Sequence, residues 1–309
     1  MSTFVHWNYD FQTNKITNTS FRYSFQTFVI LRSEISLFNT LEKIFLGINN
    51  VTSIPTEIGL LSNSLQVLNL MHCILEGEIP TEVGLLRQLK KLDLSENFLE
   101  GRIPSELGML DKVENLYLNH NYLAGQVPTE IFSMESIEGL NFAVNALSGT
   151  LPTELGLISN VQWLNTYGNW IEGTLPSELG RLHKMVAMHS SHNLFTGSIP
   201  TELGLLGQSN SLSLDIRYNE LVGQVPSELG ALTNLVILAM EGNSGLTGDM
   251  PPKICQLMDD WKLNTLSLDC DSVSCASNAC GGDQGEYCLC PVVTLNDDEV
   301  GEQQQDDTV

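Results

Sequence analysis

The chain has 309 residues, and 42% of them are hydrophobic, which excludes a globally disordered protein. It carries 14 Lys and Arg against 37 Asp and Glu, a formal net charge of −23. Proteins bind nucleic acids and anionic lipid surfaces mainly through their own basic side chains, so neither is an expected partner of this acidic chain. Divalent cations and basic partners stay open, beside the simpler interpretation that surplus acid keeps a long protein soluble.

Residues 1–40 are expected to form an irregular N-terminal cap, because FRYSFQTFVILRSEI is apolar enough to cover the end of a stack. The N-terminus shows no readable secretory signal, which a truncated or mispredicted start would explain. The sequence contains no run of 18 apolar residues, so no transmembrane segment is expected. Asn18 (N-T-S) and Asn50 (N-V-T) are glycosylation acceptors if the chain is secreted.

A repeated unit is expected to fill residues 41–254. Its clearest mark is a series of prolines spaced 24 to 26 residues apart: Pro55, Pro80, Pro104, Pro128, Pro152, Pro176, Pro200, Pro226 and Pro251. A period in the twenties predicts a solenoid, in which one supersecondary unit is stacked many times. Aligned on the prolines, the segments share the unit LxxLxLxxNxLxGxIPxELGxL. We therefore predict an α/β solenoid of about ten repeats of ~24 residues.

The LxL core of each unit predicts a short strand whose leucines point inward while the residues between them point outward. Stacked strands would pair in parallel and form one sheet on the concave side, with a width of roughly 45 Å.

An asparagine follows each predicted strand, and its amide can satisfy backbone groups where the chain turns. This predicts a structural ladder of Asn97, Asn121, Asn145, Asn169, Asn193, Asn219 and Asn243. Cys73 occupies the same place in the second unit, so that turn is expected to be weaker.

A Thr or Ser followed by Glu recurs after the prolines and predicts a short helical turn, capped by the hydroxyl and favoured by the carboxylate at its N-terminus. A cation-binding stripe is the alternative interpretation. The acidic column contains Glu57, Glu82, Glu106, Glu130, Glu154, Glu178, Glu202 and Glu228.

The candidate ligand site is the middle of the concave sheet, where aromatic side chains lie beside amides and an arginine, as in protein and glycan recognition sites. Its residues are Asn115, Tyr117, Asn141, Trp163, Asn165, Tyr167, His189, Asp215 and Arg217. Gly139 and Ala143 are expected to leave a shallow depression between the aromatic strands. Strands favour aromatics in any case, so chance clustering is the competing interpretation.

Neither catalysis, nor a metal, nor a cofactor is expected. The chain has no G-x-S-x-G, H-E-x-x-H or phosphate-loop motif. His72 and His120 would lie about 10 Å apart, and His189 and His192 would point to opposite faces of one strand. Three carboxylates face the arc, Asp93, Asp215 and Glu241, and are expected to lie several strands apart, too far for a glycosidase pair.

Residues 255–291 are expected to form a C-terminal cap with a final strand from Leu263 to Leu268. Six of the seven cysteines cluster there: Cys255, Cys270, Cys275, Cys280, Cys288 and Cys290. Their even number and close spacing predict disulfides, for which six cysteines allow 15 pairings. A structural zinc site is the rival interpretation, but their spacings lack its usual C-x2-C pairs. The acidic tail, residues 292–309, is expected to be disordered.

The repeat unit resembles the plant-specific class of extracellular leucine-rich repeat, found in receptor ectodomains and polygalacturonase-inhibitor-like proteins. The acidic, cysteine-capped chain is also similar to leucine-rich-repeat proteins of microalgae. The resemblance covers about residues 41–269. It implies a leucine-rich-repeat horseshoe that binds a protein, peptide or glycan ligand on its concave face, with a co-receptor as a further partner.

The resemblance also implies an extracellular or cell-surface location. A structural or adhesive matrix protein with an acidic, cation-binding surface is the alternative function. An intracellular scaffold in the cytoplasm, which would need reduced cysteines, is the third.

Overall fold

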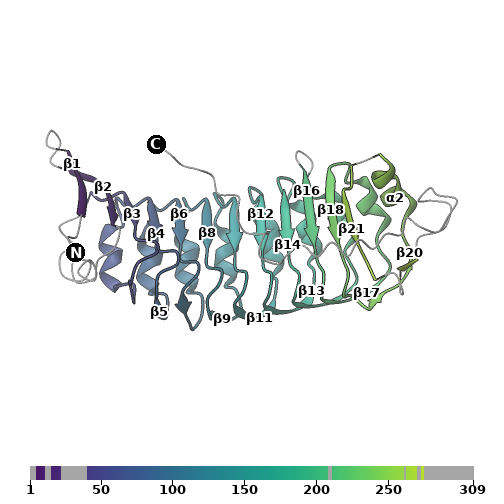
Figure 1. Cartoon of the computed structure of the whole chain (residues 1–309), viewed down its shortest axis with the longest axis horizontal. Coiled ribbons are helices and arrows are strands. Elements are labelled where there is room, and N and C mark those ends of the chain that lie inside the picture. Colours follow the sequence, from purple (N-terminus) through teal and green to yellow (C-terminus); the bar gives the residue numbers. More distant parts are fainter. Residues whose placement is uncertain are drawn as a thin grey trace.

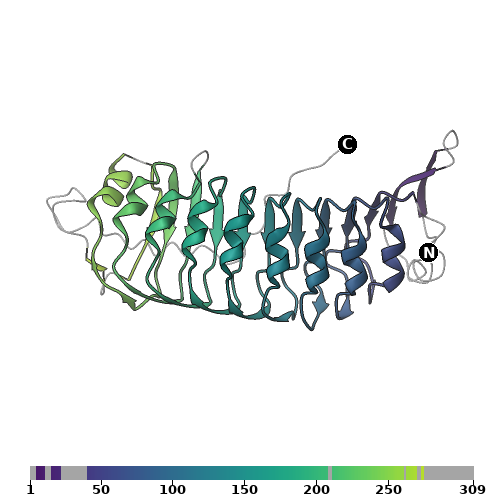
Figure 2. The ribbon, with the colours of Figure 1, turned by 180° about the vertical axis from the view of Figure 1, so that it is seen from behind.

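The computed structural model describes residues 5–10, 15–21, 40–207, 211–260, 262–269 and 273–274. The repeats stack along one axis into an elongated, gently curved solenoid (Figure 1). One sheet runs along the front of this view, and short helical turns cover the back (Figure 2).

The front sheet has twelve strands in the order β1-β2-β3-β4-β6-β8-β10-β12-β14-β16-β18-β21. Their bounds are β1 Val5–Asp10, β2 Lys15–Phe21, β3 Lys43–Phe45, β4 Val67–Asn69, β6 Lys91–Asp93, β8 Asn115–Tyr117, β10 Gly139–Asn141, β12 Trp163–Asn165, β14 Ala187–His189, β16 Leu212–Asp215, β18 Leu235–Ala239 and β21 Thr265–Ser267. Apart from the antiparallel pair β1–β2, the strands pair in parallel. The predicted solenoid with a parallel concave sheet is confirmed. We call it the concave sheet.

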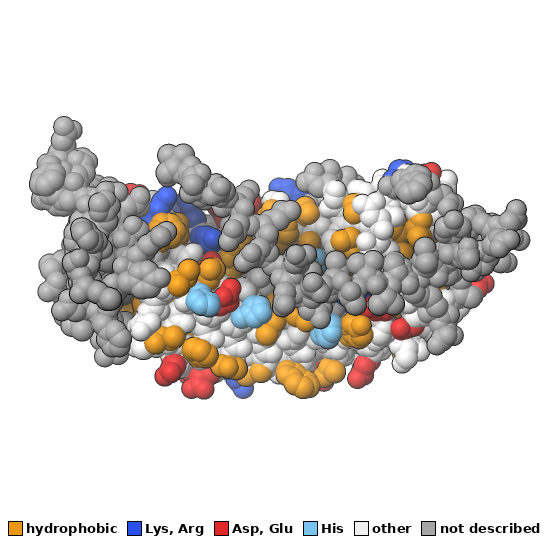
Figure 3. Space-filling model, viewed as in Figure 1, with side chains coloured by type: hydrophobic (Ala, Val, Ile, Leu, Met, Phe, Trp, Pro, Cys, Tyr) orange, Lys and Arg blue, Asp and Glu red, His pale blue; other side chains and the backbone are white. Residues whose placement is uncertain are grey.

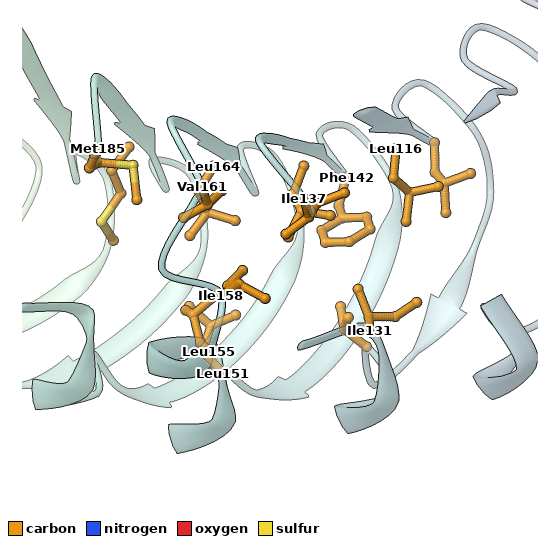
Figure 4. Close-up of a cluster of buried hydrophobic side chains, with 14 of the residues drawn as sticks. Leu116, Ile131, Ile137, Phe142, Leu151, Leu155, Ile158, Val161, Leu164 and Met185 are labelled. Carbon is orange, nitrogen blue, oxygen red and sulfur yellow. The ribbon is translucent and has the colours of Figure 1, made fainter. Parts of the chain in front are cut away.

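Leucines of successive strands form the core because the register brings equivalent positions together. Leu116, Leu140 and Leu164 are paired across β8, β10 and β12 and are almost fully buried. Apolar side chains from the helical turns, such as Ile131 and Leu155, meet them from the opposite side (Figure 4). The repeats therefore share one continuous hydrophobic core.

The turns after the prolines are 3-10 helices rather than α-helices: η2 Thr56–Leu61, η3 Thr81–Leu85, η4 Ser105–Met109, η5 Thr129–Ser133, η6 Thr153–Leu157, η7 Ser177–Arg181, η8 Thr201–Leu205 and η9 Ser227–Ala231. The predicted hydroxyl cap is wrong, because the N-cap is the proline and carries no side-chain cap. The hydroxyl instead donates to the neighbouring glutamate, as from Thr129 to Glu130 at 3.4 Å.

The glycine of each ELG segment allows adjacent 3-10 helices to touch. A Cβ on Gly108 would lie 2.4 Å from the carbonyl oxygen of Glu130 in the next repeat. The repeat pattern alone did not indicate this role for the glycine.

A second series of short strands, in one six-stranded and two two-stranded sheets, runs along the solenoid and was not predicted; we call it the flank sheet. Six of its strands form one sheet: β9 Ala124–Gly125, β11 Ala146–Thr150, β13 Trp170–Thr174, β15 Leu194–Gly197, β17 Glu220–Gly223 and β19 Gly245–Leu246. The pair β5 Glu76–Gly77 and β7 Phe98–Leu99 precedes them, and β20 Gly248–Asp249 pairs with β22 Val273–Ser274. The in–out alternation of xLxG was the available signal, since Leu99 and Leu123 are buried while Phe98 and Tyr122 are exposed.

The ladder asparagines bind the backbone of two successive repeats. Asn97 accepts from the amide of Leu75 at 3.0 Å and donates to the carbonyls of Leu70, Leu94 and Ser95 at 2.9 to 3.0 Å. Cys73 donates only to the carbonyl of Leu46, at 3.2 Å. Burial raises the pKa of the Cys73 thiol, and the amides of Asn49 and Val51 partly oppose this shift.

The residue before the ladder position has a left-handed backbone in successive repeats, with φ from 49° to 73°. The column is Ile48, His72, Glu96, His120, Val144, Gly168, His192, Tyr218 and Gly242. Only two members are glycines, so the others hold a conformation that costs an L-residue roughly 1–2 kcal/mol. The mixture of side chains in this slot concealed its backbone requirement.

Both ends differ from the rest. Strands β1 and β2 extend the concave sheet within residues 1–40, where the sequence predicted an irregular cap. At the other end, α2 (Pro252–Asp259) replaces a 3-10 helix, and β21 lies within the predicted final strand. Cys255 is disulfide-bonded. The other five cap cysteines and the tail, residues 292–309, lie outside the described residues.

Candidate functional site

Strand register arranges the outward side chains of the concave sheet in rows that run across the strands. Asn115, Gly139, Trp163, Ala187 and Ser213 form the first row. Tyr117, Asn141, Asn165, His189 and Asp215 form the second row. Tyr167 and Arg217 follow their strands by two residues. The nine predicted site residues therefore come from five adjacent strands.

Trp163 stands between two positions that have almost no side chain. Gly139 and Ala187 flank it in register on the neighbouring strands, and 46% of the Trp163 surface is exposed. We call these three residues the tryptophan notch. A Cβ on Gly139 would lie 2.8 Å from Oδ1 of Asn115, so a larger residue would close one side of the notch. Gly139 and Ala143 are both buried, and the shallow depression expected between the aromatic strands stays a prediction.

The second-row amides have a structural task that sequence reasoning missed. Oδ1 of Asn141 accepts from the amide of Ala143 at 3.1 Å, and Oδ1 of Asn165 accepts from that of Tyr167 at 3.0 Å. Each side chain thereby closes the end of its own strand. Among the described residues, nothing accepts from their Nδ2 groups within hydrogen-bond distance, so these donors face the concave surface.

Tyr117 borders the notch and is fixed by its neighbours. Its hydroxyl donates to Oδ1 of Asn115 at 3.0 Å, and Nζ of Lys91 lies 5.2 Å from its ring centroid. Burial, and then the charge of Asp93, raise the pKa of Tyr117 above its ordinary value. The phenol therefore stays neutral at physiological pH.

A charged cluster begins on β16, two strands from Trp163 on β12. Arg217 donates to both carboxylate oxygens of Asp215 at 2.9 Å, and its Nη1 lies 3.7 Å from Oε1 of Glu241. Ser191 donates to Asp215 at 3.0 Å. The expected separation of Asp215 and Glu241 by several strands is wrong, because they belong to adjacent repeats. Arg217 lies against both carboxylates and neutralises one charge of the pair, while Asp215 raises the pKa of Arg217.

The histidines do not form the arrangement that the sequence suggested. Nε2 of His189 lies 3.3 Å from the Ser213 hydroxyl, and burial lowers the pKa of His189, with Asp215 opposing. His192 follows the end of β14, and its ring contacts Tyr167 and Tyr218 at centroid distances of 5.1 and 4.4 Å. The expectation that His192 lies on the strand, opposite His189, is therefore wrong.

The two glycosylation candidates lie in different surroundings. Asn50 is exposed directly after the turn that follows β3. Asn18 lies on β2. Both stay predictions.

Comparison with known families agrees with this architecture. Residues 64–86 and 88–110 match the family model described as Leucine Rich Repeat. No curated protein matches the chain. No helix among the described residues has the length and apolar character that a bilayer crossing needs.

Two of the similar solved structures are plant receptors. The Arabidopsis receptor kinase HAESA, in complex with the peptide hormone IDA and the co-receptor SERK1, is 30% identical with a TM-score of 0.70. The match covers 76% of this chain and 38% of HAESA. The plant peptide hormone receptor RGFR1, in complex with RGF2, is 29% identical with a TM-score of 0.63, over 76% of this chain and 41% of the receptor. The chain thus spans about two fifths of these receptor chains.

A third similar structure is a plant ice-binding protein. It is 22% identical with a TM-score of 0.68, over 89% of this chain and 87% of that protein. At this identity the likeness concerns the fold alone.

Proposed function

Because the chain is a leucine-rich-repeat protein of the plant type, we propose that it is a non-catalytic recognition module that binds an extended segment of a peptide or protein across the middle of its concave sheet. The observation that carries the proposal is the tryptophan notch. A large aromatic surface is left exposed there between Gly139 and Ala187 on adjacent strands.

The surroundings of the notch suit a peptide backbone. The Nδ2 groups of Asn141 and Asn165 offer donors to peptide carbonyls one row away from Trp163. The charged cluster of Asp215, Arg217 and Glu241 begins two strands farther along, about 10 Å from β12 at the usual strand spacing. An extended segment of about three residues would span this distance.

Similar structures support a peptide over other ligands. HAESA and RGFR1 are both described in complexes with peptide hormones, and HAESA with a co-receptor as well. By analogy, a co-receptor is a candidate second partner for this chain.

An extracellular or cell-surface location belongs to the same proposal. The disulfide at Cys255 supports it, because disulfides persist in oxidising compartments. The alternative role, an acidic matrix protein that binds cations, stays a prediction. Among the described residues, no group of three or more His, Cys, Asp or Glu could hold a metal ion.

The test starts from peptides selected on the wild-type chain from a random displayed library. Their affinities are then measured for Trp163→Ala, which removes the aromatic surface, and for Gly139→Leu, which fills the notch. Leu157→Ala is the control, since this apolar side chain is also exposed but lies on η6, on the helical side.

We expect Trp163→Ala to weaken binding at least tenfold, as removal of a central aromatic anchor usually does, and Leu157→Ala to leave it unchanged. Failure to select any peptide, or equal losses in the Trp163→Ala and Leu157→Ala variants, would contradict the proposal.

A further inference from the structure

The flank sheet carries an exposed apolar column that the concave site does not include. Phe98, Tyr122 and Trp170 are exposed by 47%, 62% and 61%, and Ile74 by 37%. The rings of Phe98 and Tyr122 are stacked at a centroid distance of 6.3 Å. With Ala146 between Tyr122 and Trp170, these residues form what we call the flank stripe. Figure 3 shows hydrophobic side chains along the lower edge of the molecule, where Figure 1 places the flank sheet.

The fold itself does not need aromatics at these positions. Each stripe residue follows the ladder position and points outward, while the next residue, such as Leu99 or Ile171, is buried in the core. The same slot holds Ala146 and Glu220 in other repeats, so small or charged side chains are compatible with the stack. Recurrence of large exposed aromatics in a slot that tolerates alanine indicates an interaction surface.

The charges around the flank stripe define its partner. The outward positions of the flank sheet and of the adjoining loops carry an excess of acidic side chains over basic ones. Arg102 is basic, and the acidic residues are Glu76, Glu78, Glu100, Glu172 and Glu220. Glu76 is paired in register with Phe98 on β7. A second copy of this chain would bring the same acidic surface and a net charge of −23 against it.

Aromatic faces beside carboxylates match one side chain in particular. A guanidinium stacks on aromatic rings and pairs with carboxylates through its planar donors, whereas an ammonium stacks less well. We propose that the flank stripe docks a basic, arginine-bearing segment of a partner protein, at a surface separate from the concave site.

The experiment compares two fluorescent peptides of equal length and charge, one of alternating Arg and Gly and one of alternating Lys and Gly. General acidity attracts both alike, so a preference for the Arg peptide isolates what the planar guanidinium adds by stacking and by bidentate pairing, and the aromatic variants separate the two. We expect the wild-type chain to bind the Arg peptide about fivefold more tightly. In the double variant Tyr122→Ser with Trp170→Ser, which keeps the charge, this preference should disappear.

Two matched controls locate the effect. Trp163→Ser removes an exposed aromatic from the concave sheet and should keep the Arg preference. Glu100→Gln with Glu172→Gln should weaken both peptides more than Glu106→Gln with Glu130→Gln, which removes the same charge from the helical side.

Equal affinities for the two peptides, or a preference that survives in the double serine variant, would overturn the proposal. Binding of cellohexaose that depends on Tyr122 and Trp170 would also overturn the proposal, because the occupant would then be a glycan. Self-association of the wild-type chain that the double variant abolishes, measured by sedimentation, would assign the stripe to a second copy and overturn it as well.

Discussion

Cys73 interrupts the asparagine ladder and gives a natural test of what one ladder asparagine contributes. We predict that Cys73→Asn stabilises the chain, and that Asn97→Cys, the reverse change one repeat later, destabilises it. Asn97 accepts one hydrogen bond and has two amide protons shared among three carbonyls, so it contributes about three hydrogen bonds. The Cys73 thiol donates one, to Leu46, and the amides of Asn49 and Val51 meet only its sulfur, which is a weak acceptor.

The magnitude follows from this difference of two hydrogen bonds. At about 1 kcal/mol net for each buried hydrogen bond, Asn97→Cys should cost about 2 kcal/mol. Cys73→Asn should gain about 1 kcal/mol, because the surrounding backbone has adapted to a thiol and part of the benefit is lost in refitting it. Both variants exchange side chains of similar size, so cavity effects stay small.

The assay needs a local measurement as well as a global one, because a stack of repeats can open in parts. Urea unfolding followed by circular dichroism gives the global change. Hydrogen exchange at the Leu75 amide, which Asn97 accepts from at 3.0 Å, gives the local change. A cost below about 0.5 kcal/mol for Asn97→Cys with unaltered exchange at Leu75, or a loss of stability in Cys73→Asn, would refute the reasoning.

Three further predictions concern backbone contacts and pH. Gly108→Ala should destabilise the chain by about 2 kcal/mol in urea unfolding, because its Cβ would lie 2.4 Å from the Glu130 carbonyl oxygen. Gly59→Ala, whose nearest contact is 3.1 Å, should cost clearly less, and equal costs would contradict the prediction. Gly168→Ala should cost about 1 kcal/mol. Its φ is +64°, and the added Cβ would make only ordinary van der Waals contacts with Val144, from 3.7 Å. A neutral result would show that the left-handed column carries no strain. Burial lowers the pKa of His189 in the folded chain, so the unfolded chain binds this proton more readily. The free energy of unfolding should therefore fall as the pH drops through the ordinary histidine value of about 6.5. His189→Gln should reduce that fall, and an identical pH profile of stability in the two chains would contradict the prediction.

The repeat pattern predicted the concave sheet well because strand position follows directly from leucine spacing. Trp163 and Asn165 emerge on one face of β12 with Leu164 between them in the core, as the LxL unit indicates. Equivalent positions are 24 residues apart over most of the chain, so the rows of the candidate site could be assembled by alignment alone.

Features that depend on local hydrogen bonding escaped this approach. The second-row amide of Asn141 closes its own strand through the Ala143 amide, which spacing does not reveal. The Thr129 hydroxyl prefers Glu130 over the helix end, because Pro128 already sets an extended N-cap. Contact between Arg217 and Glu241 arises from the side-chain conformation of a long residue, and no periodicity encodes that.

The central claim is that a ligand covers Trp163, and one fluorescence measurement tests it most directly. The chain has four tryptophans, and replacing Trp7, Trp170 and Trp261 by Phe leaves Trp163 as the sole emitter. Addition of a selected peptide should shift the emission of this half-exposed side chain to shorter wavelength, with the same midpoint as the binding curve. Unchanged Trp163 emission at saturating peptide would place the ligand elsewhere and contradict the account.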